Sequence, residues 1–547
     1  MQKKTGPAWP SALAFAAMRF SSLSRMTACL ALGLALGGVK AAERPNIVLI
    51  MCDDMGWSDI GCYGGEVSTP SLDRLAAEGM RFTQFYNNAK CTTTRASILT
   101  GLYPRRGKGG LLRQNMVTLG EAMKLAGYQT ALSGKWHLGS GETTHPYRRG
   151  FDEYYGLLDG CCNFFDPKQR DPGYKGGRIR QFGHNDRDVS EFPDDYYTTD
   201  AFTDHAIECV GKFAKKDDPF FLHICYTAPH YPLHAKPKDI KKYLGKFKMG
   251  WDVMRRQRHE RLVKMGLVNP KWKLSGRDSR AYGWESANHD HEDLRMAVYA
   301  AMIDSMDQNI GRLMAALRDS GEADNTLVLF LSDNGGCAEE PGGRSPKIIP
   351  GPKEFYAAVG PSWGWAQNSP FRRYKSWAHE GGIATPCIAW WPGRVPKGAI
   401  TKEVGHIIDF LPTFLELAGA DYPKRHNGHD ILPVEGKSLV KVLRGGTRKG
   451  HDQIAWEWSG NRALREGKWK LVWDKLGKNW TLFDLEADRT ETRDLASANP
   501  ERVARMVALL RRQIANGRST PGPKLANGRP RINLNPRLPD FVRKQLK

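Results

Sequence analysis

Closely spaced metal-binding cysteines, internal repeats and low-complexity tracts are all missing from this sequence of 547 residues. Its ten cysteines show neither the tight spacing of a structural zinc site nor the density of a small disulfide-linked domain, although eight of them could pair in an oxidising compartment. Beyond the N-terminal region, no apolar run is long enough to cross a membrane. These absences argue against zinc-finger, repeat and integral membrane proteins.

Negative charge is also scarce, since 59 acidic residues stand against 81 Lys and Arg and give a net charge of +22. A charge of this sign favours a polyanionic partner, either nucleic acid or a sulfated or phosphorylated substrate. The sequence contains no recognised nucleic-acid-binding motif. We therefore expect no nucleic-acid partner.

The first 42 residues contain five basic residues and no acidic one. An apolar run over residues 28–39 follows the basic positions, and residues 39–41 form a small-residue cleavage site. This order is typical of a signal peptide, and the apolar run is too short to span a membrane comfortably. We expect residues 1–42 to be a cleaved leader and the protein to be exported, periplasmic or secreted, with no stable membrane span.

Apolar runs alternate with helical patterns through most of the chain, which predicts a mostly parallel sheet covered by helices. The predicted buried strands are residues 46–51, 128–133, 220–226 and 326–331. A turn-rich link at residues 436–450 is followed by shorter strand-like runs and then by a helical pattern at residues 501–514. This second part predicts a small sheet with one helix packed on it.

Acidic and amide side chains follow two of these predicted strands. Asp53 and Asp54 come directly after the first strand, and Asp333 and Asn334 come after the fourth. In α/β sheets, ligands usually bind at the carboxyl ends of the strands. Two adjacent carboxylates repel each other unless a cation lies between them, so the pair at 53–54 indicates either a cation site or solvated turn residues.

Cys91 stands before a run of threonines and a short helical segment. Thr is a good N-cap, so we expect Cys91 to lie where free backbone N–H groups favour a thiolate or another anion. Arg95 is one helical turn further on and could reach back to the Cys91 side chain. The alternative is a buried, inert cysteine.

Basic side chains in two other loops could face the same site. Lys135 and His137 are two residues apart in an extended segment between glycines, so they point the same way and could bind an anion. His230 lies between two prolines after the third predicted strand and is held rigidly there. Each could instead have a purely structural role.

Residues 91–101 resemble the signature of the type I sulfatases, which is Cys-x-Pro/Ala-x-Arg followed by a small-residue helix that ends in Leu-Thr-Gly. Five further motifs of that family occur in the same chain order between residues 44 and 515. They include Gly-Lys-Trp-His at 134–137, the run from 368 to Lys375 and the helix at 406–417. The sequence departs from the family pattern at Thr93, where Pro or Ala is usual, and at Arg373, where Gly is usual.

The resemblance implies an α/β fold of the alkaline-phosphatase superfamily. It consists of a large, mostly parallel sheet sandwiched by helices and a smaller C-terminal α+β domain with a short antiparallel sheet. We place the catalytic domain at residues 43–435 and the small domain at 436–517, followed by a basic, Pro-rich tail at 518–547.

The resemblance also implies a metal site and a modified nucleophile. It places Asp53, Asp54, Asp333, Asn334 and the modified Cys91 around one divalent cation, and an all-oxygen set from separate loops suits Ca²⁺ better than Mg²⁺. A maturation enzyme converts the cysteine of this family to formylglycine (3-oxoalanine), whose hydrate attacks sulfur.

Roles for the remaining side chains follow from the same resemblance. Arg95 and Lys135 would stabilise the deprotonated hydrate, and His137 would take its remaining proton to release sulfate. His230 or Lys375 would protonate the leaving oxygen, and both would help Lys135 hold the sulfate oxygens.

A basic segment at residues 236–280 contains fifteen Lys or Arg against four acids, interleaved with Trp251 and Trp272. It could be a solvated helical surface or one wall of a cleft for a sulfated glycan. We therefore expect a sulfuric ester hydrolase (arylsulfatase-like) that acts on a sulfated carbohydrate or another small sulfate ester. The alternatives are a phosphodiester or phosphonate monoester hydrolase of the same superfamily, and a non-catalytic glycan-binding protein if Thr93 prevents maturation of Cys91.

Overall fold

The computed structural model describes residues 44–104 and 112–517. The predicted leader at 1–42 and tail at 518–547 lie outside these residues. Within the described ranges, no helix combines the length and the apolar character needed to cross a bilayer.

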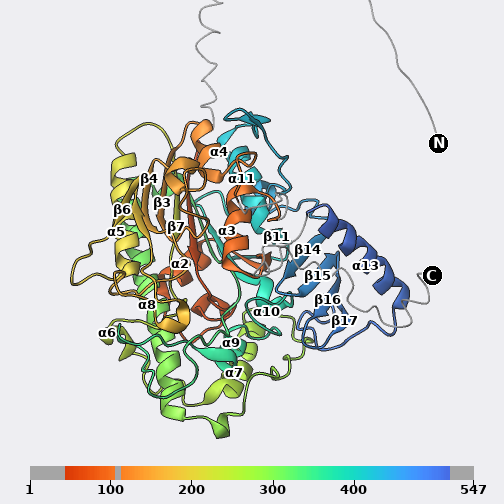
Figure 1. The fold of residues 1–547 in the computed structure, drawn as a ribbon. Coiled ribbons are helices and arrows are strands. Elements are labelled where there is room, and N and C mark those ends of the chain that lie inside the picture. The colour runs from red at the N-terminus through yellow and green to blue at the C-terminus, as the bar shows by residue number, and fades with distance from the viewer. Residues whose placement is uncertain (1–43, 105–111, 518–547) are drawn as a thin grey trace, which may run out of the picture. The chain divides into compact units, whose positions relative to one another are not determined.

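An eleven-stranded sheet forms the centre of the fold (Figure 1). Its middle strand, β1 (Asn46–Cys52), pairs in parallel with β7 (Phe220–Cys225) on one side and with β8 (Thr326–Ser332) on the other. Every residue of these three strands is buried, as the continuous apolar runs predict for strands covered on both faces.

The remaining strands make the sheet mixed but mostly parallel. The sheet order is β10-β2-β9-β8-β1-β7-β3-β4-β5-β6, with β11 paired to β2. The strand β9 runs antiparallel to both β2 and β8, and β5 and β6 form an antiparallel edge. The bounds are β2 (Met80–Tyr86), β3 (Gln129–Gly134), β4 (Glu153–Leu157), β5 (Phe182–His184), β6 (Arg187–Val189), β9 (Ala384–Trp390), β10 (Ala399–Thr401) and β11 (Gly405–His406).

Helices cover both faces of the sheet, as the alternating pattern predicts (Figure 1). Val48 and Ile50 of β1 pack in a core with α2 (Pro70–Glu78), α5 (Thr198–Phe213) and α8 (His289–Asp319). Ile47 and Leu49 face the opposite way, into a second core with α3 (Cys91–Thr100), α4 (Leu119–Leu125) and α11 (Phe410–Ala418). The alternation of side chains along β1 therefore builds two separate cores.

Shorter helices lie in the connections between these elements. They are α6 (Pro237–Ile240), α7 (Gly250–Lys264), α9 (Gly360–Gln367), α10 (Glu380–Ile383) and α12 (Val440–Leu443). Trp251 of α7 is fully buried and packs edge-on against Trp284 and Trp363. Neither interpretation of the basic segment, a solvated surface or the wall of a cleft, therefore applies to Trp251, because this side chain belongs to a core.

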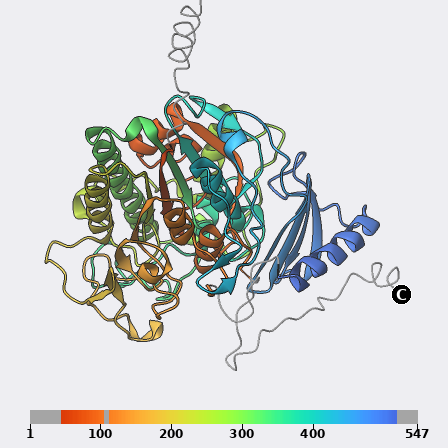
Figure 2. The ribbon, with the colours of Figure 1, turned by 90° about the horizontal axis from the view of Figure 1, so that it is seen from above.

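The C-terminal part is a four-stranded antiparallel sheet, β14 (Ile454–Trp458), β15 (Asn461–Glu466), β16 (Trp469–Asp474) and β17 (Asn479–Asp484). The helix α13 (Pro500–Ala515) lies across one face of this sheet (Figure 2). Val503, Val507 and Leu510 of α13 pack on Leu464 and Leu482. The small sheet with one helix that the sequence predicts is therefore present.

A buried ion-pair network joins this sheet to the larger one. The Lys470 ammonium of β16 lies 2.7 Å from Glu380 Oε1 and 2.8 Å from Glu491 Oε1, and all three side chains are buried. Arg489 donates to the other oxygen of Glu380 at 2.7 Å. Removing one member of such a network leaves uncompensated charge in the interior.

We accordingly expect Lys470→Ala to lower the free energy of unfolding by about 3–5 kcal/mol. Urea unfolding followed by circular dichroism measures this change. Lys441→Ala is the matched control, because Lys441 is exposed, and it should change stability by less than about 0.5 kcal/mol. Equal stabilities of the two variants would contradict a structural role for the network.

Several buried histidines make stability depend on pH. Burial lowers the pKa of His205, His223 and His234 to about 4 and that of His406 to about 3. In the unfolded chain these imidazoles bind protons near pH 6.5, so between about pH 6.5 and pH 4 the unfolded state holds more protons than the folded state. Stability should therefore fall as the pH is lowered through this window.

Urea unfolding at several pH values between 7 and 4 measures this dependence. We expect His234→Gln to flatten the slope by up to about 1.4 kcal/mol per pH unit, because one of the linked protons is removed. A wild-type stability that stays constant from pH 7 to pH 4 would refute the linkage.

Candidate active site

The polar residues after β1 and β8 meet at one edge of the sheet. The two strands are parallel neighbours in a register that pairs Cys52 with Ser332, so the residues that follow them lie side by side. The Asp54 backbone N–H donates to Asp333 Oδ1 at 3.2 Å, and Asn334 Nδ2 donates to Asp54 Oδ1 at 2.7 Å. Asp53 is buried with them. The structure thus brings together the four predicted metal ligands that follow these two strands.

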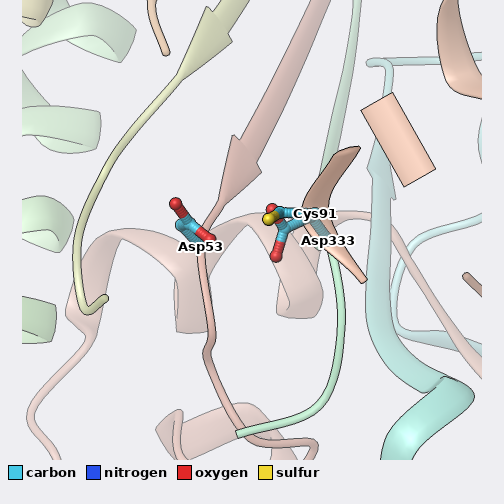
Figure 3. Close-up of side chains that lie close together, drawn as sticks. All are labelled: Asp53, Cys91 and Asp333. Carbon is cyan, nitrogen blue, oxygen red and sulfur yellow. The ribbon is translucent and has the colours of Figure 1, made fainter. Parts of the chain in front are cut away.

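Cys91 is the first residue of α3 and faces these carboxylates (Figure 3). Its Sγ atom and carboxylate oxygens of Asp53 and Asp333 all lie within 4.8 Å of one another. The N-cap of α3 is Lys90, so the threonine cap expected from the sequence is wrong. Thr93 instead donates its hydroxyl to the backbone oxygens of Asn88 and Lys90, at 3.1 and 2.9 Å, and holds the turn before Cys91.

Three buried cations neutralise the carboxylates. Lys135 donates to Asp53, and Lys375 Nζ lies 2.7 Å from Asp54. Arg95 donates to Asp333 Oδ2 at 3.0 Å and to the backbone oxygen of Lys135 at 2.8 Å. The spacing along the helix suggested that Arg95 could contact the Cys91 side chain, but in the structure Arg95 is hydrogen-bonded to Asp333.

Two imidazoles complete the cluster. His137 Nδ1 lies 3.6 Å from Cys91 Sγ, and His230 Nε2 lies 3.4 Å from Asp54 Oδ2. Asp54 and His137 both have positive φ angles, 66° and 59°, which non-glycine residues seldom adopt. Strained backbone of this kind is typical of functional sites.

The pKa values in this cluster follow from burial and from the neighbouring charges. Burial and the facing carboxylate of Asp333 raise the pKa of Asp53. Burial also raises the pKa of Asp54, but the charges of Lys375 and His230 outweigh it and hold that pKa below its usual range. Burial and the charge of Lys135 lower the pKa of His137, which favours its neutral form.

The donor atoms of the cluster fit a divalent cation. Asp53 Oδ1 and Asn334 Oδ1 are both buried, and neither has a hydrogen-bond partner among the residues that the structure describes. Buried polar atoms nearly always have a partner, so two free oxygens that belong to one cluster point to a missing ligand. Three carboxylates and one amide form an oxygen-rich set, which suits hard cations such as Ca²⁺.

Lys90, Tyr231 and Glu339 border the cluster, and the sequence analysis assigned none of them a role. Tyr231 Oη donates to Glu339 Oε2 at 2.7 Å, and Lys90 Nζ lies 3.4 Å from Glu339 Oε1. The Glu339 side chain is 39% exposed, so it is open to solvent at the edge of a buried site. The positions of Lys90 beside Cys91 and of Tyr231 beside His230 could have indicated both residues, whereas no local pattern marks Glu339.

Comparison with known proteins gives consistent matches. The sulfatase family model matches residues 45–420, and the model for the C-terminal region of N-sulphoglucosamine sulphohydrolase matches residues 371–520. An arylsulfatase of Klebsiella aerogenes is 32% identical over 455 residues, which are 76% of this chain and 96% of the relative. An N-acetylgalactosamine-6-sulfatase of Canis lupus familiaris is 30% identical over 430 residues, 73% of this chain and 67% of the relative.

A solved structure agrees with these sequence matches. The crystal structure of Ps i-CgsB in complex with k-i-k-neocarrahexaose is similar to this chain with a TM-score of 0.64 and 27% sequence identity. The similarity covers 87% of this chain and 93% of that structure.

Proposed function

Because this chain belongs to the sulfatase family of the alkaline-phosphatase superfamily and is a sulfuric ester hydrolase, we propose that it removes sulfate from a sulfated carbohydrate with a formylglycine made from Cys91 and a bound calcium ion. The observation that carries this proposal is the buried group of Asp53, Asp54, Asp333 and Asn334 beside Cys91. A carbohydrate substrate is supported by a relative named for N-acetylgalactosamine 6-sulfate and by the similar structure that binds a neocarrahexaose.

Asp53, Asp54, Asp333 and Asn334 would hold the calcium ion. When bound, the ion supplies positive charge that stabilises charge developing on the sulfate oxygens. Lys135, Arg95 and Lys375 each contact one of these carboxylates, which fixes the direction in which the carboxylates point. The residues of this chain thus preorganise the site before substrate arrives.

The environment of Cys91 suits an oxygen nucleophile at this position. Formylglycine, when present, supplies that nucleophile as its hydrate. Burial and the nearby cations favour the neutral form of His137, so its Nδ1 atom, 3.6 Å from Cys91 Sγ, can accept a proton from a group bonded there. The positive charges of Arg95 and Lys135 favour an anion at the same place.

Lys375 and His230 lie on the Asp54 side of the cluster. Despite burial, the charge of Asp54 raises the pKa of Lys375, so this ammonium remains protonated and can bind sulfate oxygens. Burial lowers the pKa of His230 to about 4. The proton for the leaving oxygen of the sugar comes either from Lys375, which is protonated at neutral pH, or from His230 after it has taken up a proton.

A comparison of substrates tests the proposed function. The sulfate and phosphate esters of 4-nitrophenol separate a sulfatase from a phosphoester hydrolase, and a panel of sulfated mono- and oligosaccharides tests the carbohydrate. We expect hydrolysis of 4-nitrophenyl sulfate and release of sulfate from at least one sulfated saccharide. Preference for the phosphate ester, or release from no saccharide, would contradict the proposal.

A further inference from the structure

A cavity with a volume of about 540 Å³ is lined by none of the residues of the Cys91 cluster. Three segments of the chain bound it. They are residues 263–272 at the end of α7 and just after it, the strand β2, and the turn between β15 and β16. Leu267, Val268 and Leu485 give it an apolar lining. Its volume is in the range of cavities that bind small ligands.

A buried cation that forms no direct ion pair with any described residue lies in the wall of this cavity. Arg465 is 8% exposed, and its guanidinium donates to Tyr86 Oη, Gln84 Oε1 and the backbone oxygen of Gly467 at 2.7, 2.8 and 2.9 Å. All three acceptors are neutral, and no described carboxylate lies within ion-pair distance of Arg465. Glu380 accepts a hydrogen bond from the same Tyr86 hydroxyl and interacts electrostatically with Arg465, so the positive charge of Arg465 is partly compensated and acts in part on the cavity.

Other basic residues strengthen this positive field. Lys402 lines the cavity, is exposed and forms no ion pair with any residue of the described ranges. Lys468 also lines it, although Asp484 pairs with it at 2.8 Å. The one acidic lining residue is Glu486, so basic residues exceed acidic ones in the lining.

Trp272 adds a flat aromatic surface. Its indole Nε1 donates to the backbone oxygen of Glu486 at 2.9 Å, which fixes the ring in the cavity wall. Lys271 and Lys273 on either side of Trp272 are exposed. Of the two tryptophans in the basic segment at 236–280, Trp272 lines this cavity, whereas Trp251 belongs to a core.

We propose that this cavity is a second, non-catalytic binding site for sulfated oligosaccharide. A sulfated sugar has an apolar ring face that can pack on Trp272 and anionic groups that can bind Lys402, Lys468 and the field of Arg465. This inference rests on the proposed carbohydrate substrate. A polymeric substrate that binds both the cavity and the active site would be held more tightly than one that binds the active site alone.

Calorimetric titration of a heparin hexasaccharide into a Cys91→Ala background tests the site without turnover. We expect the added substitutions Lys402→Glu and Lys468→Glu to remove one class of binding site or to weaken it by about tenfold or more. The matched control carries Lys215→Glu and Lys441→Glu, which change the net charge equally at two exposed lysines outside the cavity. Arg465 is left intact because it also holds Tyr86 and Gln84.

Equal weakening in both double variants, or in neither, would overturn the proposal. Hydrogen exchange provides a second readout that needs no cavity variant, since the hexasaccharide should protect residues 263–272 and 465–468 in the Cys91→Ala protein. Inorganic sulfate and maltohexaose serve as comparison probes. Equal protection by sulfate alone would indicate a simple anion site, and equal protection by maltohexaose would exclude recognition of charge.

The outcome of this test can be distinguished from the outcome of the test of the proposed function. Binding in the cavity without hydrolysis of any sulfated saccharide would contradict the carbohydrate sulfatase alone. Hydrolysis of sulfated saccharides without binding in the cavity would contradict the second site alone.

Discussion

Replacing Cys91 with Ala should lower kcat for 4-nitrophenyl sulfate by roughly 10⁵-fold or more, to the background rate. Alanine cannot be converted to formylglycine, so the variant lacks the proposed nucleophile. Lys135, His230 and Lys375 remain in place to bind sulfate, so the affinity for a sulfated ligand should stay within a few-fold of the wild-type value. Initial rates and calorimetry measure the two quantities separately.

A second thiol provides the control for this experiment. Cys62 is also buried, but it lies near α2, away from the carboxylate cluster. Cys62→Ala removes a thiol of the same kind and should retain activity. Rates close to wild type in the Cys91→Ala protein would refute the assignment of the nucleophile.

Replacing Asp54 with Asn should lower kcat/KM by roughly 10³-fold and abolish the stabilisation that calcium gives to the wild-type protein. The substitution keeps the shape of the side chain but removes a charge that the proposed cation needs. It also removes the closer of the two carboxylate partners of the buried Lys375 and leaves only Glu339, at 3.8 Å, so the melting temperature of the metal-free variant should fall. The difference between the melting temperatures with Ca²⁺ and with EDTA is therefore the informative readout.

For the wild-type protein, we expect EDTA to remove activity and lower the melting temperature, and Ca²⁺ to restore both. Asp152→Asn is the matched control, because Asp152 lies near the surface and pairs with Lys124 rather than with the cluster. It should respond to Ca²⁺ as the wild type does. A calcium shift that persists in Asp54→Asn would show that the ion binds elsewhere.

The parallel centre of the fold was predictable because its strands are continuous apolar runs. Such runs require burial on both faces, and the carboxyl ends of neighbouring parallel strands meet at one edge. The strand pattern puts each of the pairs Asp53–Asp54 and Asp333–Asn334 at a strand end, and the resemblance to the type I sulfatases implies that the two pairs share one cation. A local pattern also marks the start of α4, where Thr118 and Glu121 form a capping box.

Other features depend on long-range contacts that no local pattern encodes. The antiparallel position of β9 between β2 and β8 follows from the packing of whole segments rather than from strand composition. In the same way, Arg95 donates a hydrogen bond to Asp333, which follows β8 and lies 238 residues further along the chain. Trp251 and Trp272 look alike within a basic segment, and only the packed structure separates a core residue from one that lines a cavity.

The mass of the peptide that contains Cys91, measured in the purified active protein, tests the central claim most directly. Conversion of the CH2SH side chain to the CHO of formylglycine lowers that mass by about 18 Da, since one sulfur and two hydrogens are lost and one oxygen is gained. The account predicts this lower mass in a fraction that rises with specific activity across preparations. An active enzyme whose Cys91 remains entirely an unmodified thiol would contradict it.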